Sequence, residues 1–354
     1  MNSLEVSRFA QRSGYKAALP VLVLILLGLP RPATAATTLR PADAARAAKY
    51  SEARRGNAIL VMQNGQTIYE HYANGGATDR RWPIYSGTKS FWGIAALVAA
   101  QEGLISLDGR VADIITEWKS DARKSRITIR QLLNATDGLD GAPPLHRQSI
   151  RDRNAEAVRL PVVAGSGSAF IYGPSHLQIF AEVLRRKLGG SDPASYLQQK
   201  VLSPLGLGNL DYKRDKSGNA LPATGFELSA REWARFGKMI LDDGRGIVDG
   251  AVLRQAFNGS RANPAYGLTF WLNRQAPVGR EADIEDLLDL KWQQVNWGGV
   301  CFCREAPADT LVALGSGYQR LFIIPSLKAL IVRQGKDREF SDAEFLRLVL
   351  GRAR

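Results

Sequence analysis

A serine and a lysine stand three residues apart in the segment Ser86-Gly87-Thr88-Lys89. On a helix, residues at i and i+3 face the same side, so this spacing places a lysine amine beside a serine hydroxyl. A hydroxyl is a weak nucleophile at neutral pH until a base removes its proton. A lysine can be that base when burial or neighbouring charge lowers its pKa. The pair therefore predicts nucleophilic chemistry at Ser86 with Lys89 as its base.

Sequence context separates this pair from a chance match. A second pair with the same spacing, Ser13 and Lys16, lies at the N-terminus beside an apolar stretch. Ser86 instead follows two β-rich runs and a polar loop, and the residues after it, SFWGIAALVAAQEG, carry apolar side chains at helical spacing. We therefore expect Ser86 at a loop-to-helix junction. The alternative is that Ser86 caps the helix and Lys89 is a solvated charge.

The elements that must position this junction follow from apolar periodicity and turn residues. The run 58–72 predicts a β-hairpin because Asn64-Gly65 separates two β-rich segments. Further patterns predict helices over 36–55, 127–139, 174–190, 229–244 and 341–352, and strands over 266–273, 310–316, 319–325 and 329–335. A lone hairpin is marginally stable, so we expect the early strands to join the late ones in one sheet.

The predicted fold class is therefore mixed α/β (α+β), with an antiparallel β-sheet flanked by helices. Residues of about 36–107 and 250–354 would form the sheet part, and a mostly helical insertion would occupy about 108–249. We expect the functional site in the crevice between these two parts. The stretch 275–300, with Trp292 and Trp297, is expected to shape the pocket.

The N-terminal residues have the pattern of an export signal. A basic start precedes an apolar stretch over 17–29 and the small-x-small sequence Ala33-Thr34-Ala35. We predict a signal peptide over 1–35, a mature domain over 36–354, and a periplasmic or secreted location. An uncleaved anchor is the alternative, and no stable membrane span is expected after cleavage.

Composition excludes several other classes of protein. The net charge is +13, but the basic residues are scattered and no nucleic-acid-binding motif occurs, so no nucleic-acid partner is expected. A solvated basic surface explains the charge, with weak attraction to anionic lipid or cell-wall polymer as the alternative. Cys301 and Cys303 form a C-x-C pair whose disulfide would be strained, so two reduced thiols are predicted. Three isolated histidines and the lack of a phosphate-binding loop predict neither a metal ion nor a cofactor.

Several segments, taken together, resemble the class C β-lactamase and penicillin-binding-protein superfamily of serine hydrolases. The resemblance covers roughly residues 55–335, in the family's order and spacing. The segments that carry it are IYSGTKSFWGIAALVAAQEGLISLDGRV (84–111), ITIRQLLNATDGL (127–139), AFIYGPSHLQIFAEVLRRKLG (169–189), YLQQKVLSPLGL (196–207) and ATGFELSAREWARFG (223–237).

The resemblance implies a role for each matching residue. Ser86 would be the nucleophile and Lys89 its base partner, while Tyr172 matches the tyrosine of the family's Tyr-x-Asn motif. Tyr172 would share proton transfer with Lys89, and the nearby ammonium would favour its phenolate form. The oxyanion hole would use the backbone N–H groups of Ser86 and Ser316.

Two departures from the family pattern bear on the substrate. Pro174 stands where the family has asparagine, and Ala313-Leu314-Gly315 stands where it has Lys-Thr-Gly or His-x-Gly. A shifted register would place Gly315-Ser316-Gly317 there, and neither register offers a cation for a substrate carboxylate. The resemblance is therefore closest in character to the esterase and 6-aminohexanoate-dimer-hydrolase branches, with a small ester, amide or peptide-like substrate.

Alternatives and further pocket candidates complete the sequence-based prediction. A β-lactamase or D-alanyl-D-alanine carboxypeptidase is one alternative function, and a non-catalytic binding protein on the same scaffold is another. No G-x-S-x-G sequence supports a Ser-His-Asp hydrolase. Gly315, Gly317, His176 and Asp137 are candidates for the substrate pocket, and His176 is also a candidate auxiliary base. The acyl donor and the oligomeric state do not follow from the sequence.

Overall fold

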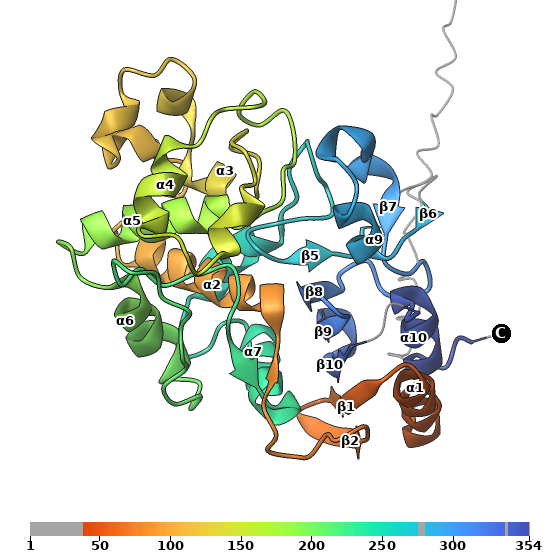
Figure 1. The fold of residues 1–354 in the computed structure, drawn as a ribbon. Coiled ribbons are helices and arrows are strands. Elements are labelled where there is room, and N and C mark those ends of the chain that lie inside the picture. Colours follow the sequence, from red (N-terminus) through yellow and green to blue (C-terminus); the bar gives the residue numbers. More distant parts are fainter. Residues whose placement is uncertain (1–37, 275–279, 337–338, 354) are drawn as a thin grey trace, which may run out of the picture. The chain divides into compact units, whose positions relative to one another are not determined.

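A six-stranded antiparallel sheet forms the centre of the domain (Figure 1). The computed structural model describes residues 38–274, 280–336 and 339–353, and the predicted signal peptide lies outside them. Within these ranges, no helix combines the length and apolar character needed to cross a membrane. The strand order is β2-β1-β10-β9-β8-β5, with bounds Gly56–Gln63 (β1), Gln66–Tyr72 (β2), Trp271–Leu272 (β5), Leu311–Gly315 (β8), Gln319–Ile324 (β9) and Ala329–Gly335 (β10).

The predicted N-terminal hairpin joins the C-terminal strands. Asn64 and Gly65 both adopt positive φ, 51° and 77°, which a two-residue turn between twisted strands requires. Strand β1 then pairs antiparallel with β10, with Val61 opposite Ile331. This pairing confirms that residues far apart in the sequence build one antiparallel sheet.

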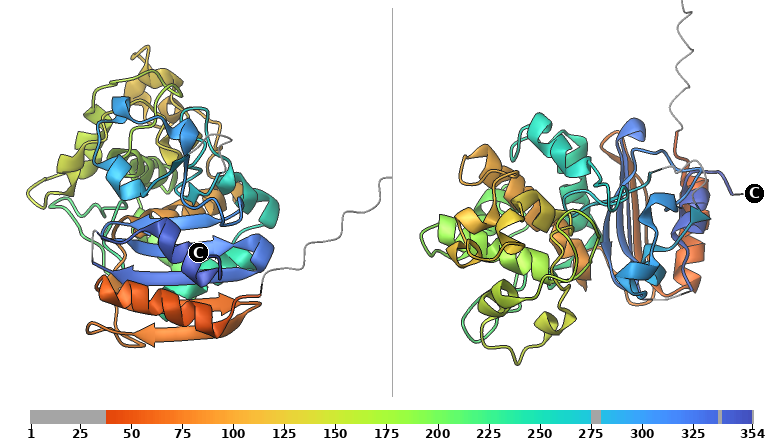
Figure 2. Two further views of the ribbon diagram at one scale, coloured as in Figure 1. Left: turned by 90° about the vertical axis from the view of Figure 1, so that its right-hand side faces the viewer. Right: turned by 90° about the horizontal axis from the view of Figure 1, so that it is seen from above.

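Helices cover both faces of the sheet (Figure 2). Helices α1 (Pro41–Ala53) and α10 (Asp342–Val349) pack together on one face, and α7 (Ala230–Leu241) lies against β1, β9 and β10 on the other. Strands β8, β9 and β10 are buried along their whole length. Burial on both faces explains why these strands read as continuous apolar runs instead of alternating patterns.

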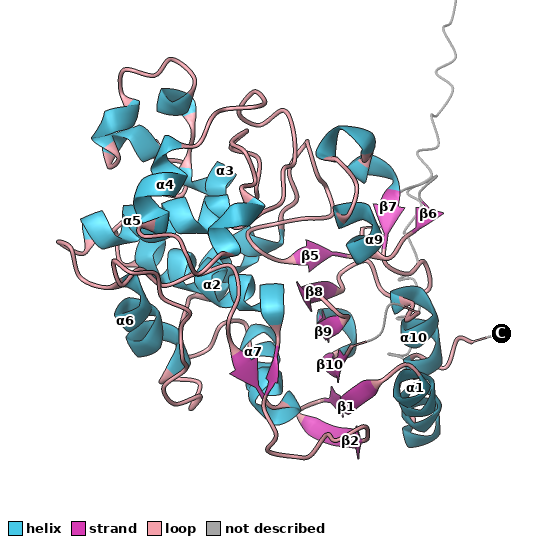
Figure 3. Ribbon diagram, in the orientation of Figure 1, coloured by secondary structure: helices cyan, strands magenta, loops and turns pink. Residues whose placement is uncertain are grey.

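The regular elements between β2 and β5 are mostly helices, joined by long loops (Figure 3). Their largest buried element is α2 (Thr88–Gln101), in which every residue from Thr88 to Ala99 is buried. The other helices are α3 (Ile129–Leu133), α4 (Arg153–Arg159), α5 (Ser175–Lys187), α6 (Pro193–Leu197) and α8 (Gly250–Leu253), with α9 (Ile284–Leu288) after β5. Helix α7 falls within the range 108–249 that was assigned to the insertion, yet it packs on the sheet.

Short paired strands complete the architecture. Strand β3 (Trp82–Pro83) pairs with β4 (Glu227–Leu228), and β6 (Arg280–Glu281) pairs with β7 (Val300–Cys301). Two predicted elements are shorter than expected. In the run 266–273, Thr269 takes φ 67° and only β5 is strand, and α3 stops at Leu133 because Ala135 takes φ 56°.

Candidate active site

Ser86 lies in a single 3₁₀ turn, Tyr85–Gly87, directly before α2. The turn is anchored to the segment before α7, because the Ile84 N–H donates to the Phe226 carbonyl over 2.9 Å. Tyr85 has φ 45°, an uncommon conformation for a residue with a side chain. The predicted loop-to-helix junction is confirmed, and a strained residue directly precedes the candidate nucleophile.

Two glycines let neighbouring elements approach this turn. A Cβ on Gly315 would lie 1.9 Å from the Ile84 carbonyl oxygen, and a Cβ on Gly87 would lie 2.8 Å from the Trp233 ring. The end of β8 therefore packs against the backbone of the Ser86 turn. A larger residue at position 315 would push β8 away from the turn, and a larger residue at position 87 would push the turn away from Trp233 on α7.

Lys89 is buried beside Ser86 without a carboxylate partner. Its Nζ lies 2.9 Å from Ser86 Oγ and donates to the Ala223 carbonyl over 3.1 Å. Among the ion pairs of the described residues, none includes Lys89. Burial therefore acts unopposed and lowers the pKa of Lys89 to about 7. Near neutral pH a large fraction of Lys89 is an unprotonated amine, which can accept a proton.

Tyr172 is the third residue of this group. Its ring centroid lies 4.6 Å from Lys89 Nζ, and its hydroxyl is hydrogen-bonded to Ser86. Burial raises the pKa of Tyr172 to about 12, although the hydrogen bond with Ser86 opposes this shift. These surroundings oppose the expected phenolate character, since desolvation outweighs both the hydrogen bond with Ser86 and the positive charge of Arg320. Near neutral pH Lys89 can therefore accept a proton, whereas Tyr172 carries one.

Close backbone contacts and neighbouring aromatic rings fix Tyr172. The Ile171 N–H donates to the Ala135 carbonyl over 3.0 Å, and a Cβ on Gly173 would lie 2.0 Å from the Gly141 oxygen. The Tyr172 ring also meets Tyr266 edge-on at 6.0 Å. Pro174 takes the N-cap position of α5, so the position of the family's asparagine offers no amide here.

Ser316 and Gly317 form the tight turn between β8 and β9. Ser316 is exposed, and Gly317 and Tyr318 adopt φ of 72° and 58°. Since β8 packs against Ile84 and Gly87, this turn begins next to Ser86. The role of the Ser316 N–H as a second oxyanion-hole donor stays a prediction.

His176 and Asp137 form a buried pair. His176 Nδ1 lies 2.7 Å from Asp137 Oδ2, and the Leu139 N–H donates to Asp137 Oδ1 over 2.7 Å. His176 Nε2 has no hydrogen-bond partner within the described residues. The two side chains are 4% and 0% exposed and do not line the cavity beside Tyr172. Asp137 thus orients His176 and shapes its own loop.

A largely apolar cavity of about 270 Å³ opens beside Tyr172. Asp140 and Lys291 are the charged residues of its lining. The apolar part comes from Pro143, Val163, Phe170, Ile171, Leu287, Leu288, Leu290, Trp292, Val295 and Trp297. Both Trp292 and Trp297 are among these residues, which places part of the predicted pocket segment there; residues 275–279 lie outside the described ranges.

One group of side chains could in principle bind a metal ion, but an arginine already binds two of its members. Glu281, Cys303 and Glu305 bring their ligand atoms within 4.8 Å of one another. Arg347 is hydrogen-bonded to Glu281 and donates to Glu305 over 3.0 Å. Burial also raises the pKa of Cys303 to about 11, so this thiol keeps its proton, and Cys301 is likewise a free buried thiol. Arg347 therefore balances the negative charges of Glu281 and Glu305.

Sequence reasoning missed the groups that support the site from behind. The Ala223 carbonyl that accepts from Lys89 has no signal in the sequence, since any residue has a carbonyl. Glu285 accepts hydrogen bonds from the turn after β8, although it is 31 residues from Ser316 in the sequence. Only the tertiary contacts identify both groups.

The arrangement can be compared with known proteins. The sequence model of the family described as Beta-lactamase matches residues 40–330. Protein flp of Staphylococcus aureus is 24% identical over 190 residues, which cover 49% of this chain and 38% of that protein. Monacolin J acid methylbutanoyltransferase of Aspergillus terreus is 28% identical over 156 residues, or 37% of each chain. The chain thus spans well under half of the length of these curated relatives.

Solved structures share the fold at low sequence identity. A family VIII carboxylesterase is 16% identical with a TM-score of 0.62, covering 89% of this chain and 98% of that one. A D-stereospecific amidohydrolase from Streptomyces sp. is 16% identical with a TM-score of 0.60, covering 83% and 94%. EstCE1, a hydrolase with promiscuous acyltransferase activity, is 17% identical with a TM-score of 0.63, covering 88% and 96%. The predicted fold class is confirmed.

Proposed function

The chain belongs to the Beta-lactamase family of serine hydrolases, and we propose that it cleaves an ester or amide through an acyl-enzyme on Ser86. The observation that carries the proposal is the 2.9 Å distance between Lys89 Nζ and Ser86 Oγ in surroundings that lower the pKa of Lys89 to about 7. A neutral amine at hydrogen-bond distance from a hydroxyl is the requirement for general-base activation of a serine.

In the acylation step, Lys89 takes the Ser86 proton while Oγ attacks the substrate carbonyl carbon. The carbonyl π electrons move to oxygen, and the N–H groups of Ser86 and Ser316 stabilise the resulting oxyanion. When the oxyanion collapses, the bond to the leaving group breaks. Tyr172, whose pKa is about 12, gives its proton to the departing oxygen or nitrogen and regains one from the Lys89 ammonium. The products are the free alcohol or amine and an acyl ester of Ser86.

In the deacylation step, water attacks the acyl ester and its proton passes to Lys89. The oxyanion collapses again, Ser86 regains its proton from Lys89, and the carboxylic acid leaves. An alcohol could replace water in this step and would give a new ester. Two of the similar proteins carry acyl transfer in their names, which makes alcohol acceptors worth including in the assays.

The cavity beside Tyr172 favours an uncharged substrate. Its lining is mainly aliphatic and aromatic, and Ala313-Leu314-Gly315 supplies no cationic side chain at the strand beside Ser86. The feature that would favour the alternative, a carboxylate-bearing β-lactam or D-alanyl peptide, is Lys291 in the cavity lining. If Lys291 bound a carboxylate, Lys291→Ala would raise KM for a β-lactam but not for a neutral ester.

The proposed chemistry is tested by covalent labelling. The purified chain is incubated with a fluorophosphonate probe, its intact mass is measured, and the labelled peptide is sequenced. A single adduct on Ser86 that is lost in Ser86→Ala and strongly slowed in Lys89→Met supports the proposal. An adduct that forms at the same rate without the lysine amine contradicts it, and absence of any adduct would favour a binding protein on this scaffold.

Hydrolysis of p-nitrophenyl butyrate gives a second readout. If an acyl-enzyme accumulates, added methanol competes with water, so methyl butyrate appears while p-nitrophenol release is maintained or accelerated.

We also propose that the chain is exported and that cleavage follows Ala35. Support comes from the basic start, the apolar stretch over 17–29 and the Ala-Thr-Ala sequence. N-terminal sequencing of the protein isolated from its own cell distinguishes a start at Ala36 from a retained anchor.

A further inference from the structure

The turn after β8 is closed by the pairing of Gly315 with Gln319, whose side chain also donates to the Gly317 carbonyl over 3.1 Å. Gly317 and Tyr318 both adopt positive φ, so this turn holds a non-glycine residue in an unfavourable conformation. Ser316, whose N–H is the second donor of the proposed oxyanion hole, is exposed at the tip. An oxyanion hole stabilises charge only if its donors are held in place before the reaction. The position of the Ser316 N–H therefore depends on the contacts that hold this turn.

Glu285, from helix α9, holds the turn from behind. Its Oε2 accepts the Gly317 N–H over 3.0 Å, and its Oε1 accepts the Tyr318 N–H over 2.7 Å. One carboxylate thus binds two successive backbone N–H groups, immediately after the N–H of Ser316. Hydrogen bonds to an ionised acceptor are about twice as strong as neutral ones.

Arg320 fixes both Glu285 and the strand end. Its guanidinium is fully buried and donates to Glu285 Oε1 over 3.0 Å and to the Gly315 carbonyl over 3.0 Å. Asp342, also fully buried, receives the other side of the guanidinium at 2.8 and 3.1 Å. Arg333 adds a hydrogen bond of 3.1 Å to the Gly317 carbonyl. The carbonyls around Ser316 are therefore held by buried arginines, and the N–H groups by the partly buried Glu285.

The same carboxylate lies close to the candidate proton donor. The negative charge of Glu285 raises the pKa of Tyr172, and the positive charge of Arg320 lowers it. Leu287 and Leu288, two and three residues further along α9, line the apolar cavity. Glu285 thus lies between the turn, the cavity wall and Tyr172.

We propose that Glu285 is a positioning residue that holds the Ser316 N–H in the oxyanion hole through its two hydrogen bonds to the β8–β9 turn. The inference rests on the proposed hydrolysis at Ser86. Glu285 does not touch the reacting atoms and acts only through the backbone of Gly317 and Tyr318. Loss of its carboxylate should weaken the binding of the transition state and leave the binding of the ground state nearly unchanged.

The test compares Glu285→Ala and Glu285→Gln with the wild-type protein. With p-nitrophenyl butyrate, kcat of Glu285→Ala should fall by about 10- to 100-fold and KM by no more than a factor of about three, since a displaced donor costs less than a deleted one. Phenylboronic acid forms a tetrahedral adduct on an activated serine, so its inhibition constant should rise by the same factor as kcat falls. Glu285→Gln keeps one carbonyl acceptor and should show a smaller loss in both.

Asp286→Asn is the matched control, because Asp286 is the exposed neighbour of Glu285 on the same helix. It should leave kcat, KM and the boronate constant unchanged. Thermal unfolding of each variant, followed by circular dichroism, separates loss of fold from loss of positioning. If Glu285→Ala does not fold, Glu285→Gln carries the same comparison.

Four results would overturn the inference. Folded Glu285 variants that keep the wild-type kcat and boronate affinity, with only a lower Tm, would leave Glu285 a purely stabilising residue. A rise in KM alone would assign it to substrate binding. Absence of fluorophosphonate labelling in the wild-type protein would overturn the proposed function and this inference together. If the wild type is labelled and both variants are labelled at the same rate, the inference alone is overturned.

Discussion

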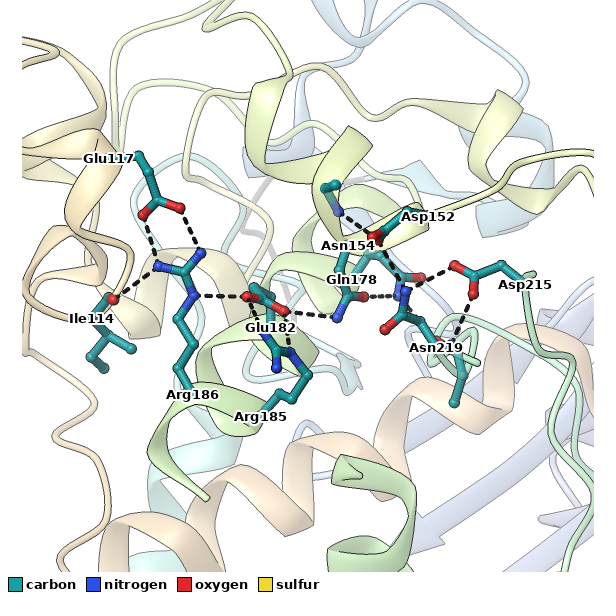
Figure 4. A network of polar contacts seen from close by, with 12 residues as sticks. Ile114, Glu117, Asp152, Asn154, Gln178, Glu182, Arg185, Arg186, Asp215 and Asn219 are labelled. Atoms are coloured by element: carbon teal, nitrogen blue, oxygen red, sulfur yellow. Dashed lines mark hydrogen bonds and ion pairs between the residues drawn. The ribbon is translucent and has the colours of Figure 1, made fainter. Parts of the chain in front are cut away.

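Lys89 and Glu182 are both buried ionisable residues on helices, and their surroundings are opposite. Lys89 donates to a hydroxyl and to a carbonyl but has no carboxylate partner, and its pKa falls to about 7. Glu182 on α5 accepts from Arg185, from Arg186 and from Asn154 (Figure 4). Burial alone would raise the pKa of Glu182, but these hydrogen bonds lower it.

The Glu182 network extends over much of the helical part. Arg186 also binds Glu117, and Asn154 joins Glu182 to Gln178 (Figure 4). The network lines a cleft of about 810 Å³, larger than the cavity beside Tyr172. The larger hollow is lined by charges that neutralise one another, whereas the smaller one is lined by Tyr172, whose ring centroid lies 4.6 Å from Lys89 Nζ. Cavity size is therefore a poor guide to chemistry here, and an uncompensated buried charge is a better one.

The largest difference should appear in activity when Lys89 is replaced. Lys89→Met removes the base while keeping an unbranched apolar side chain, and kcat/KM for p-nitrophenyl butyrate should fall by about 10³- to 10⁴-fold. Ser86→Ala should abolish burst-phase release of p-nitrophenol. Lys119→Met, which changes an exposed lysine, is the control and should retain full activity. A Lys89→Met enzyme with more than a tenth of the wild-type kcat/KM would contradict the assigned role.

Lys89→Met should also be more stable than the wild-type protein, and this gain should be largest at low pH. Lys89 has a pKa of about 7 in the folded protein and an ordinary value of 10.5 in the unfolded chain, so the unfolded chain binds more protons between these values and stability rises with pH there. Below pH 7 Lys89 is protonated in both the folded and the unfolded state, so the whole cost of burying its charge lowers the free energy of unfolding. Lys89→Met should therefore raise the free energy of unfolding by about 3 kcal/mol at pH 6, and the gain should shrink towards pH 10. Urea unfolding at both pH values measures it, and equal gains would refute the assignment.

Replacing Glu182 in the paired network should lower the stability and leave the activity unchanged. Glu182→Gln leaves two arginines without their carboxylate and should cost about 2 kcal/mol of stability, because the arginine side chains are partly exposed and screened. The activity at Ser86 should stay within twofold of wild type. Since the pKa of Glu182 is lowered, its contribution is present above the unfolded pKa and is lost as the pH falls through the folded value. Glu156→Gln, exposed on α4, serves as the control in urea unfolding. A loss of activity without a loss of stability would show that the two regions are coupled.

The smallest expected effect is the dependence of kcat/KM on pH. We expect kcat/KM for a neutral ester to rise with pH and to level off above about pH 7, as Lys89 loses its proton. Tyr172, with a pKa of about 12, should cause no decline below about pH 11. Initial rates between pH 5 and 10 test both statements. A profile that is flat through pH 7 would exclude Lys89 as the titrating base.

Local patterns predicted most of the elements. The turn residues Asn64 and Gly65 fixed the first hairpin, and apolar spacing located α2 directly after Ser86. These features depend on neighbours in the chain, so the residues themselves carry the information. The boundaries of α3 and β5 were less well predicted, because Ala135 and Thr269 adopt positive φ under the control of packing.

The sequence by itself determined the Ser86–Lys89 pair, since i and i+3 on one helical turn meet without help from the rest of the chain. Only the tertiary structure decided their electrostatics, because the pKa of Lys89 depends on its burial and on the Ala223 carbonyl, 134 residues away. It likewise decided that Tyr172 stays protonated and that Glu285 and Arg320 hold the turn at Ser316. Desolvation and support of a turn arise from groups that meet only after folding, and no local pattern encodes them.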